Sequence, residues 1–152
     1  MKMSKFYTLI LGSSGLIGSS LTQDLINKNH NVLGIDHNRY NFQNVKNFLF
    51  IKKKIINEID VLNLFKLIKK KNIKINKFIN LMYPKSNQKN KKFGNLKLKF
   101  INQDLNLQLG LQIFIAQEII RHFLKNNIHG KIVFCSSIQG ISAPKFSHYK
   151  NL

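Results

Sequence analysis

Short apolar runs alternate along this chain with longer segments in which apolar residues recur every three to four positions. The first run, "FYTLILG", contains a β-branched residue and ends in glycine, as a buried parallel strand does. In the longer segments the apolar residues fall on one face of a helix. The runs predict strands at 6–12, 31–36, 47–55, 74–84 and 130–137, and the periodic segments predict helices at 15–30, 59–72 and 105–127.

This order predicts an α/β fold built on a doubly wound parallel sheet with right-handed crossovers. A polar, lysine-rich stretch at 85–95 is expected to form a loop inside the domain. No repeat and no linker is visible, and 152 residues are enough for one domain with a substantial core. We therefore expect a single domain over residues 1–152.

The chain is strongly basic, with 25 lysine and arginine residues against 6 acidic ones and a formal net charge of +19. Such a balance is typical of proteins that bind nucleic acid or anionic membranes. Arginine, which nucleic-acid readers favour, occurs only at Arg39 and Arg121. Abundant lysine, asparagine and isoleucine together indicate an A/T-rich coding sequence instead. We expect no nucleic-acid partner, and a basic, non-catalytic nucleotide- or nucleic-acid-binding protein remains the alternative.

The lone Cys135 cannot form an internal disulfide, and no cluster of cysteine and histidine indicates a metal. No apolar run reaches the roughly 18 residues of a membrane span. Basic residues and a short apolar run begin the chain, but the glycine-rich turn that follows is typical of a strand end rather than a cleavage site. We expect a cytoplasmic protein with no metal and no membrane contact.

Three glycines, Gly12, Gly15 and Gly18, lie between the first predicted strand and the first helix in "LILGSSGLIGSSL". One glycine allows the tight turn, one lets the backbone approach a pyrophosphate, and one lets helix and strand pack closely. The helix N-terminus offers unpaired N–H groups to phosphates. We therefore expect this turn, including the backbone of Ser14, Leu16 and Ile17, to bind a dinucleotide cofactor.

An acidic residue, Asp36, ends the second predicted strand. A carboxylate at that place accepts hydrogen bonds from the adenosine ribose and repels a 2′-phosphate, so NAD is favoured over NADP. Arg39 nearby weakens this preference. The alternative is that Asp36 only starts a turn.

Several stretches fall in the order and spacing of one enzyme family, namely "LILGSSGLIGSSL…GID", "FINLMYP", "NLQLG" and "IVFCSSIQGISAPKF". On these motifs the chain resembles the short-chain dehydrogenase/reductase family. The resemblance extends over essentially all 152 residues, which match the first part of a family subunit. It implies a Rossmann-type fold with five strands present and the C-terminal strands missing. It also implies NAD(P)-dependent hydride transfer on an alcohol or carbonyl, and a homo-oligomeric full-length form.

Two shorter motifs narrow the resemblance. Tyr83-Pro84 after the fourth strand and Ala-Pro-Lys-Phe at 143–146 resemble a branch found among surface-polysaccharide and sialic-acid-type sugar biosynthesis genes. This branch implies a small-molecule substrate such as a sugar or a nucleotide sugar. The spacing of Gly12, Gly15 and Gly18 is also similar to that of the extended nucleotide-sugar epimerases and dehydratases, which remain an alternative.

The resemblance also implies roles for residues near the cofactor and the substrate. Asn80 matches the first asparagine of the family's Asn-Asn-Ala-Gly stretch beside the cofactor, where Met82 keeps only a backbone role. Ser137 matches the catalytic serine that hydrogen-bonds the substrate oxygen. Ser136 would match with a one-residue slip, and both serines could simply begin a loop.

Asn106 lies near the family's helix asparagine, which holds a water in the proton relay. Its distance to Gly110 is one residue longer than in the commonest pattern, and an ordinary exposed asparagine near a helix start is the alternative. One position departs from the family. Lys54 stands where an aspartate usually meets the adenine amine, and a lysine cannot accept that hydrogen bond. Asp60 comes too late to replace it and is expected within the helix.

The resemblance implies a catalytic Tyr-x-x-x-Lys pair, which the 152 residues do not contain. Tyr149 follows the two serines, but its partner would be at 153, and the adjacent Lys150 would point elsewhere. In the branch described above, a non-catalytic tyrosine of the substrate loop occupies the place of Tyr149. We therefore expect an inactive fragment whose fifth strand is a sheet edge and whose last helix exposes apolar residues, with poor solubility as a result.

Overall fold

The computed structural model describes residues 5–38, 45–84 and 93–142. Five parallel strands form one sheet in the order β3-β2-β1-β4-β5. They are β1 (Phe6–Leu11), β2 (Val32–Asp36), β3 (Phe48–Lys52), β4 (Lys74–Asn80) and β5 (Lys131–Phe134). From the central β1 the chain moves first to one side of the sheet and then to the other. The doubly wound α/β fold predicted from the sequence is therefore confirmed.

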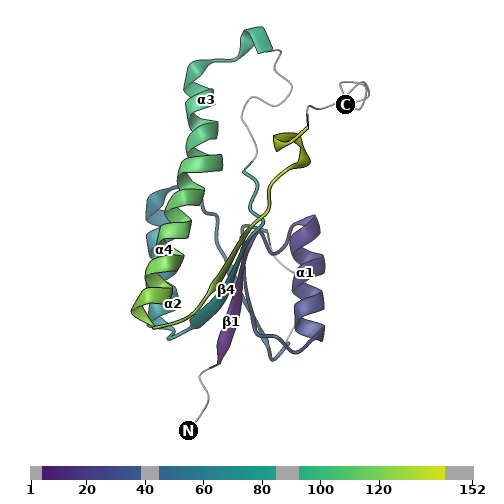
Figure 1. The fold of residues 1–152 in the computed structure, drawn as a ribbon, viewed down its shortest axis with the longest axis vertical. Helices are drawn as coiled ribbons and strands as arrows, with labels where there is room; N and C mark the ends of the chain where they lie inside the picture. The colour runs from purple at the N-terminus through teal and green to yellow at the C-terminus, as the bar shows by residue number, and fades with distance from the viewer. Residues whose placement is uncertain (1–4, 39–44, 85–92, 143–152) are drawn as a thin grey trace.

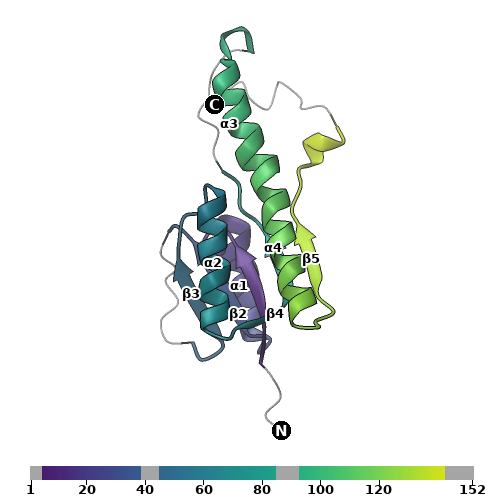
Figure 2. The same ribbon diagram turned by 90° about the vertical axis from the view of Figure 1, so that its left-hand side faces the viewer.

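Helices cover both faces of this sheet (Figure 1). α1 (Leu16–Asn27) lies on one face, and α2 (Glu58–Lys70) and α4 (Leu111–Lys125) lie on the other. α3 (Leu98–Leu105) continues the line of α4 past the carboxyl ends of the strands, as Figure 2 also shows. The carboxyl ends of β1, β2 and β4 are thus the place where loops and helix ends meet.

Two apolar cores hold the helices to the sheet. The larger core lies between the sheet and the helices α2 and α4, and its fully buried members include Leu9, Leu33, Ile68, Phe78, Ile115 and Ile119. The smaller core lies under α1 and contains Ile10, Ile26 and Val32. Because neighbouring strand residues point to opposite faces, Leu9 and Ile10 belong to different cores. Burial on both faces explains why the strands are continuous apolar runs.

The long helix predicted at 105–127 was wrong at its start. The helical rod begins at Leu98 and passes through a π turn, Asn106–Gly110, before it continues as α4. Leu98, Ile101 and Leu105 recur at helical spacing, but none of the residues from Leu98 to Gly110 is buried, so this apolar stripe lies on the surface of the described chain and the prediction missed it. The extra residue noted between Asn106 and Gly110 falls within the π turn, where hydrogen bonds span five residues instead of four.

Helices α1, α2 and α4 end in the same way. At each end an asparagine adopts a left-handed backbone, with φ of 59° at Asn29, 51° at Asn72 and 52° at Asn127. In α1 the N–H of Asn29 donates to the carbonyl of Ile26 and that of His30 to Leu25. The other two helices repeat this pair of bonds. This is the Schellman motif, in which glycine is the usual left-handed residue.

The strands are shorter than predicted at their carboxyl ends. β3 ends at Lys52, β4 at Asn80 and β5 at Phe134. Asn80 and Phe134 are paired with each other across β4 and β5. Of the predicted loop, residues 93–95 form a short 3-10 turn. Residues 85–92, the motif at 143–146 and Tyr149 lie outside the described residues.

Several large apolar side chains remain exposed. They are Ile113, Ile120 and Leu124 on α4, and Val133 and Phe134 on β5. β5 is the last strand of the sheet, so one of its backbone edges is unpaired within the described chain. The apolar helix face and the sheet edge expected from the sequence are therefore both present.

Candidate functional site

The turn between β1 and α1 packs its glycines against backbone on two sides. Gly12 has a φ of +79°, which favours glycine. A Cβ on Gly12 would lie 2.9 Å from the carbonyl carbon of Leu81, and a Cβ on Gly18 would lie 2.0 Å from the carbonyl oxygen of Gly12. No side chain fits at either place. The geometric roles predicted for these glycines, the tight turn and the close helix packing, are thus confirmed.

Gly15 leaves the space in front of α1 open. It caps the helix with an extended backbone and has no side chain to accept a hydrogen bond from the N–H groups of the first turn. Leu16 and Ile17 begin the helix with side chains that are 90% and 60% exposed. The N–H groups of a first helical turn have no acceptor four residues earlier and hold a partial positive charge. The turn is therefore suited to bind a phosphate.

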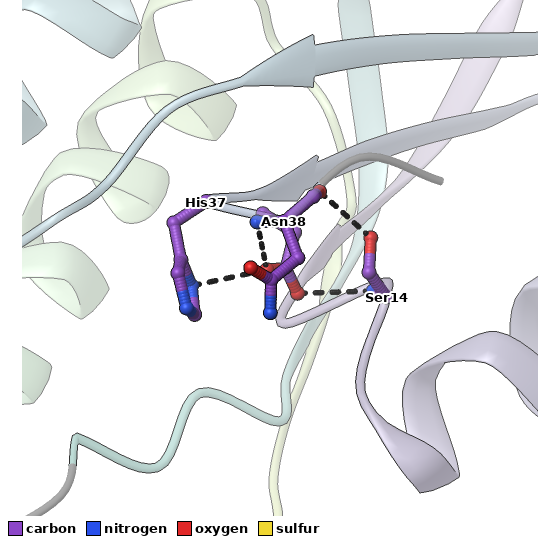
Figure 3. A network of polar contacts seen from close by, with 4 residues as sticks. Ser14, His37 and Asn38 are labelled. Atoms are coloured by element: carbon purple, nitrogen blue, oxygen red, sulfur yellow. Dashed lines mark hydrogen bonds and ion pairs between the residues drawn. The ribbon is translucent and has the colours of Figure 1, made fainter. Parts of the chain in front are cut away.

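Asp36 fastens the end of β2 to this turn (Figure 3). Its Oδ2 accepts the N–H of Ser14 at 3.0 Å, and its Oδ1 accepts the N–H of Asn38 at 2.9 Å. The Nδ1 of His37 lies 3.1 Å from the same Oδ1, and the Ser14 hydroxyl donates to the carbonyl of Asn38 at 3.2 Å. Asp36 is buried and His37 is exposed. The carboxylate predicted to bind ribose thus also organises the phosphate turn.

Ser13 is a residue of the turn that sequence analysis missed. It is fully buried, and its hydroxyl has no hydrogen-bond partner. A Cβ on Gly34 would lie 2.7 Å from the Ser13 hydroxyl oxygen, so Ser13 packs directly against β2. A glycine inside a strand marks such close approach, and Gly34 was the available signal.

The segment that leaves β4 closes against the turn from the other side. The N–H of Leu81 donates to the carbonyl of Leu11 at 2.9 Å, which extends the β1–β4 pairing by one bond. Asn80 is buried, and its Oδ1 accepts the N–H of Met82 at 3.0 Å. Asn80 and Met82, both predicted near the cofactor, therefore lie directly beside Gly12.

Gln112 and Gln108 are further residues that sequence analysis missed. The Nδ2 of Asn80 donates to Oε1 of Gln112, and the Nε2 of Gln108 donates to the carbonyl of Pro84 at 3.3 Å. Both glutamines thus reach from the helical rod to the segment that follows β4. The spacing of four residues puts them on one face of the helix, but glutamine on a helix is too common to predict such contacts.

The two predicted catalytic residues lie on different elements. The N–H of Cys135 donates to the carbonyl of Asn80 at 3.2 Å, which puts the end of β5 beside the β4 exit. Ser137 follows, and its carbonyl accepts the N–H of Gly140 in a short 3-10 turn. Asn106 lies on the π turn, where its Oδ1 would be 3.1 Å from a Cβ on Gly110.

Asp60 lies within α2, as the sequence predicted, and has a structural role at the start of this helix. Its N–H donates to the Asn57 side chain at 2.9 Å, and its Oδ2 accepts the N–H of Ile56 at 3.2 Å. The Asn57 side chain therefore caps α2, and the Asp60 carboxylate extends this cap to the residue before it, in a variant of the capping box. Lys53 lies 3.7 Å from the other carboxylate oxygen of Asp60, and Lys54 is exposed just after β3.

An open phosphate turn, a helix N-terminus and a strand-end carboxylate meet at the point where the strand order reverses. This arrangement defines a Rossmann-type dinucleotide-binding domain. The chain belongs to the NAD dependent epimerase/dehydratase family, whose model matches residues 8–142. The resemblance to short-chain dehydrogenases/reductases noted in the sequence is confirmed.

Known proteins agree with this assignment. "Post-translational flagellin modification protein A" of Campylobacter coli is 38% identical over 79 residues, which is 51% of this chain and 30% of that protein. A short chain dehydrogenase from Leptospira borgpetersenii with bound NAD+ superposes with a TM-score of 0.78 at 21% identity, over 95% of this chain and 56% of that one. ElxO with NADP bound gives a TM-score of 0.69 at 21% identity, over 95% and 60%.

The chain therefore spans just over half the length of these two solved structures and less than a third of the curated relative. Among the residues that the structure describes, no helix has the length and apolar character needed to span a membrane. The same described residues contain no group of three histidine, cysteine or acidic side chains arranged for a metal ion.

Proposed function

We propose that this chain is the cofactor-binding part of an NAD(P)-dependent oxidoreductase that transfers hydride to or from an alcohol or carbonyl. The observation that supports this most directly is the contact between Gly18 and the Gly12 carbonyl, because it places the N-terminus of α1 against the end of β1. A helix N-terminus in this place offers the N–H groups of its first turn to a phosphate. The carboxyl ends of β2 and β4, at the same edge of the sheet, supply the polar side chains of Asp36 and Asn80.

Each part of the cofactor has a matching set of residues. The N–H groups of Leu16 and Ile17, with Gly15 beside them, would bind the pyrophosphate. Asp36 would accept a hydrogen bond from the adenosine ribose with the lone pair of Oδ2 that Ser14 leaves unused, since Asn38 and His37 both lie at Oδ1. A buried carboxylate there favours NAD over NADP, because it repels a 2′-phosphate.

Substrate chemistry belongs to the carboxyl ends of β4 and β5. A bound nicotinamide would donate or accept the hydride. The Ser137 hydroxyl would hydrogen-bond the substrate oxygen, and Asn106 would hold a water for proton transfer. Without a Tyr-x-x-x-Lys pair, we expect residues 1–152 to bind the cofactor without turnover.

The proposed substrate is a small molecule, and a sugar fits best. Tyr83-Pro84 resembles the sugar-biosynthesis branch, and the name of the Campylobacter coli relative connects that protein to flagellin modification. We propose in addition a cytoplasmic location and a homo-oligomeric full-length protein.

A nucleotide-sugar epimerase or dehydratase is the second candidate. The spacing of Gly12, Gly15 and Gly18 and the description of the matching family favour it. The two functions differ in net redox change. A dehydrogenase accumulates NADH or NADPH as substrate is oxidised, whereas an epimerase regenerates its cofactor in each cycle. Cofactor absorbance during turnover by a full-length protein therefore distinguishes them.

The decisive test of cofactor binding uses titration calorimetry on residues 1–152 with NAD, NADP and duplex DNA. We expect binding of NAD, weaker binding of NADP, and loss of both in Gly15→Val, whose side chain would fill the phosphate opening. Gly94→Ala is the matched control, because a Cβ there would meet no atom within 4 Å. Salt-dependent DNA binding without NAD affinity would instead support the basic nucleic-acid-binding alternative.

A further inference from the structure

Gln112, in the first turn of α4, uses both ends of its side-chain amide. Its Oε1 accepts from the Nδ2 of Asn80, and its Nε2 donates to the carbonyl oxygen of Leu107 at 3.0 Å. Leu107 belongs to the π turn, and Asn80 is the last residue of β4. A single half-buried side chain therefore connects the helical rod to the end of a central strand.

The orientation of both amides follows from this network. A backbone carbonyl can only accept, so Leu107 requires the nitrogen of Gln112 on its side. The oxygen of Gln112 then faces Asn80, which must present its own nitrogen. The Oδ1 of Asn80 is left to accept the N–H of Met82. Each amide therefore has one arrangement that satisfies all three contacts.

The π turn is what makes the Leu107 carbonyl an acceptor for a side chain. The N–H of Leu111 donates to the carbonyl of Asn106, five residues earlier. This longer step interrupts the regular α-helical ladder, and π turns of this kind are frequent at functional sites. Gln112 comes two residues after the end of the turn and donates to a carbonyl inside it.

The other end of the network lies beside the phosphate turn. Asn80 is only 3% exposed, so its hydrogen bonds are protected from water. Through the Met82 N–H it bends the chain back after β4, and Leu81 then lies against Gly12. A shift of this segment would change the wall of the cofactor site.

The order of the strands decides which half of the cofactor this wall faces. β2, which ends in Asp36, and β4, which ends in Asn80, flank the central β1 on opposite sides. A dinucleotide whose pyrophosphate lies on the β1–α1 turn therefore directs its two nucleosides to opposite sides. With the adenosine at Asp36, the nicotinamide half falls at the β4 exit.

We propose that Gln112 is a positioning residue for the nicotinamide half of the cofactor. It acts through Asn80, by holding the β4 exit against the phosphate turn, and it uses the π turn as its anchor. This inference rests on the function proposed above. It predicts that changes at Gln112 affect ligands that reach the β4 side and spare ligands that stop at the pyrophosphate.

The test compares NAD with ADP, which lacks the nicotinamide half. Calorimetry measures both dissociation constants for the wild type, Gln112→Met, Gln112→Glu and the control Gln117→Met, whose side chain is exposed on the same helix. Methionine removes both hydrogen bonds. Glutamate keeps the acceptor for Asn80 and loses only the donor to Leu107.

We expect Gln112→Met to raise the dissociation constant for NAD about tenfold and that for ADP less than about twofold. The loss of a buried hydrogen-bond partner implies an effect of this size. Gln112→Glu should recover part of the NAD affinity, and Gln117→Met should change neither ligand. Retained ADP binding shows that the variants are folded. Equal weakening of NAD and ADP, or no weakening of either, would overturn the inference. A wild type that binds ADP but not NAD would overturn the proposed function itself.

Discussion

The backbone N–H of Ser14 donates to the carboxylate of Asp36 across 3.0 Å, and this bond joins the phosphate turn to the end of the neighbouring strand. Ser14 directly precedes Gly15, the N-cap of α1, and Asp36 ends β2. The two residues are far apart in the chain, yet neither can move without the other. Under the proposed function, we therefore expect cofactor affinity and cofactor choice to depend on the same carboxylate.

Asp36→Ala should weaken the binding of NAD about tenfold or more, because it removes both the ribose acceptor and the hydrogen bond that orders the turn. The binding of NADP should weaken less, since the repulsion of its 2′-phosphate disappears at the same time. The ratio of the two dissociation constants measures this. Asp24→Ala is the control, because Asp24 is exposed on α1, where its carboxylate pairs with Lys28 four residues later. An unchanged ratio would show that Asp36 has no part in choosing the cofactor.

Gly18→Ala should destabilise the fold by about 1–3 kcal/mol, the usual cost of forcing an extra methyl group into a packed site. The added Cβ would lie 2.0 Å from the Gly12 carbonyl oxygen, so α1 must move away from β1. NAD binding should weaken along with stability. Urea denaturation measures the free energy of unfolding, with Gly94→Ala as control. Wild-type stability in Gly18→Ala would contradict the close packing described here.

His122 should make the stability of the fold depend on pH. Its Nε2 accepts the N–H of Ile75 at 3.1 Å, which only the neutral imidazole can do. Burial, and secondarily the charge of Lys74, lower the pKa of His122 below its ordinary value of 6.5. The unfolded chain therefore binds the proton more readily. Stability is complete above about pH 6.5 and declines as the pH falls through the lowered folded-state pKa.

His122→Gln removes the titration and keeps an acceptor near Ile75. We expect it to flatten the dependence of the unfolding free energy on pH below about 6.5. The exposed His129 provides the control variant, His129→Gln. If His122→Gln and the wild type lose stability in parallel on acidification, the contact with Ile75 is not the cause.

Asp60→Ala should lower stability by about 1 kcal/mol and leave NAD affinity unchanged, because the carboxylate completes the capping box of α2. Thermal unfolding and calorimetry measure the two effects on one preparation. Asp104→Ala, on α3, provides a comparison outside this cap. A clear loss of NAD affinity in Asp60→Ala would assign this residue to adenine recognition after all.

Residues 1–152 should self-associate through exposed apolar surface. Ile113 and Leu124 on α4 are 54% and 77% exposed, and β5 leaves a strand edge open. The double variant Ile113→Lys/Leu124→Lys should therefore raise solubility and lower the sedimentation coefficient without changing NAD affinity. Lys66→Glu, on the exposed side of α2, tests whether any change of surface charge has the same effect.

The fold could be predicted because burial on two faces makes each strand a continuous apolar run, as in "FYTLIL" and "VLGID". The phosphate turn could be predicted because its close contacts admit only glycine at Gly12 and Gly18. The start of the helical rod at Leu98 was missed, although Leu98, Ile101 and Leu105 are spaced as on one face of a helix. Because α3 buries none of its residues, its apolar face marks no part of the core.

The polar network of the site was less accessible to sequence. Asp36 could be identified by its place at the end of β2, but its bond to Ser14 depends on how two distant loops meet. The partnership of Asn80 and Gln112 depends on the phase of a helix that contains a π turn. The extra residue between Asn106 and Gly110 hinted at this turn, yet its spacing alone cannot distinguish an insertion in the helix from a mismatched motif.

The left-handed ends of α1, α2 and α4 show where base composition can and cannot reshape a protein. Asparagine has A/T-rich codons and tolerates a positive φ, so it can replace glycine at Asn29, Asn72 and Asn127, where only the backbone angle matters. At Gly12 and Gly18 a neighbouring backbone also occupies the space of a Cβ, and glycine remains. Asparagine therefore meets the requirement of a left-handed backbone, whereas glycine is required where a neighbouring backbone atom occupies the place of a Cβ.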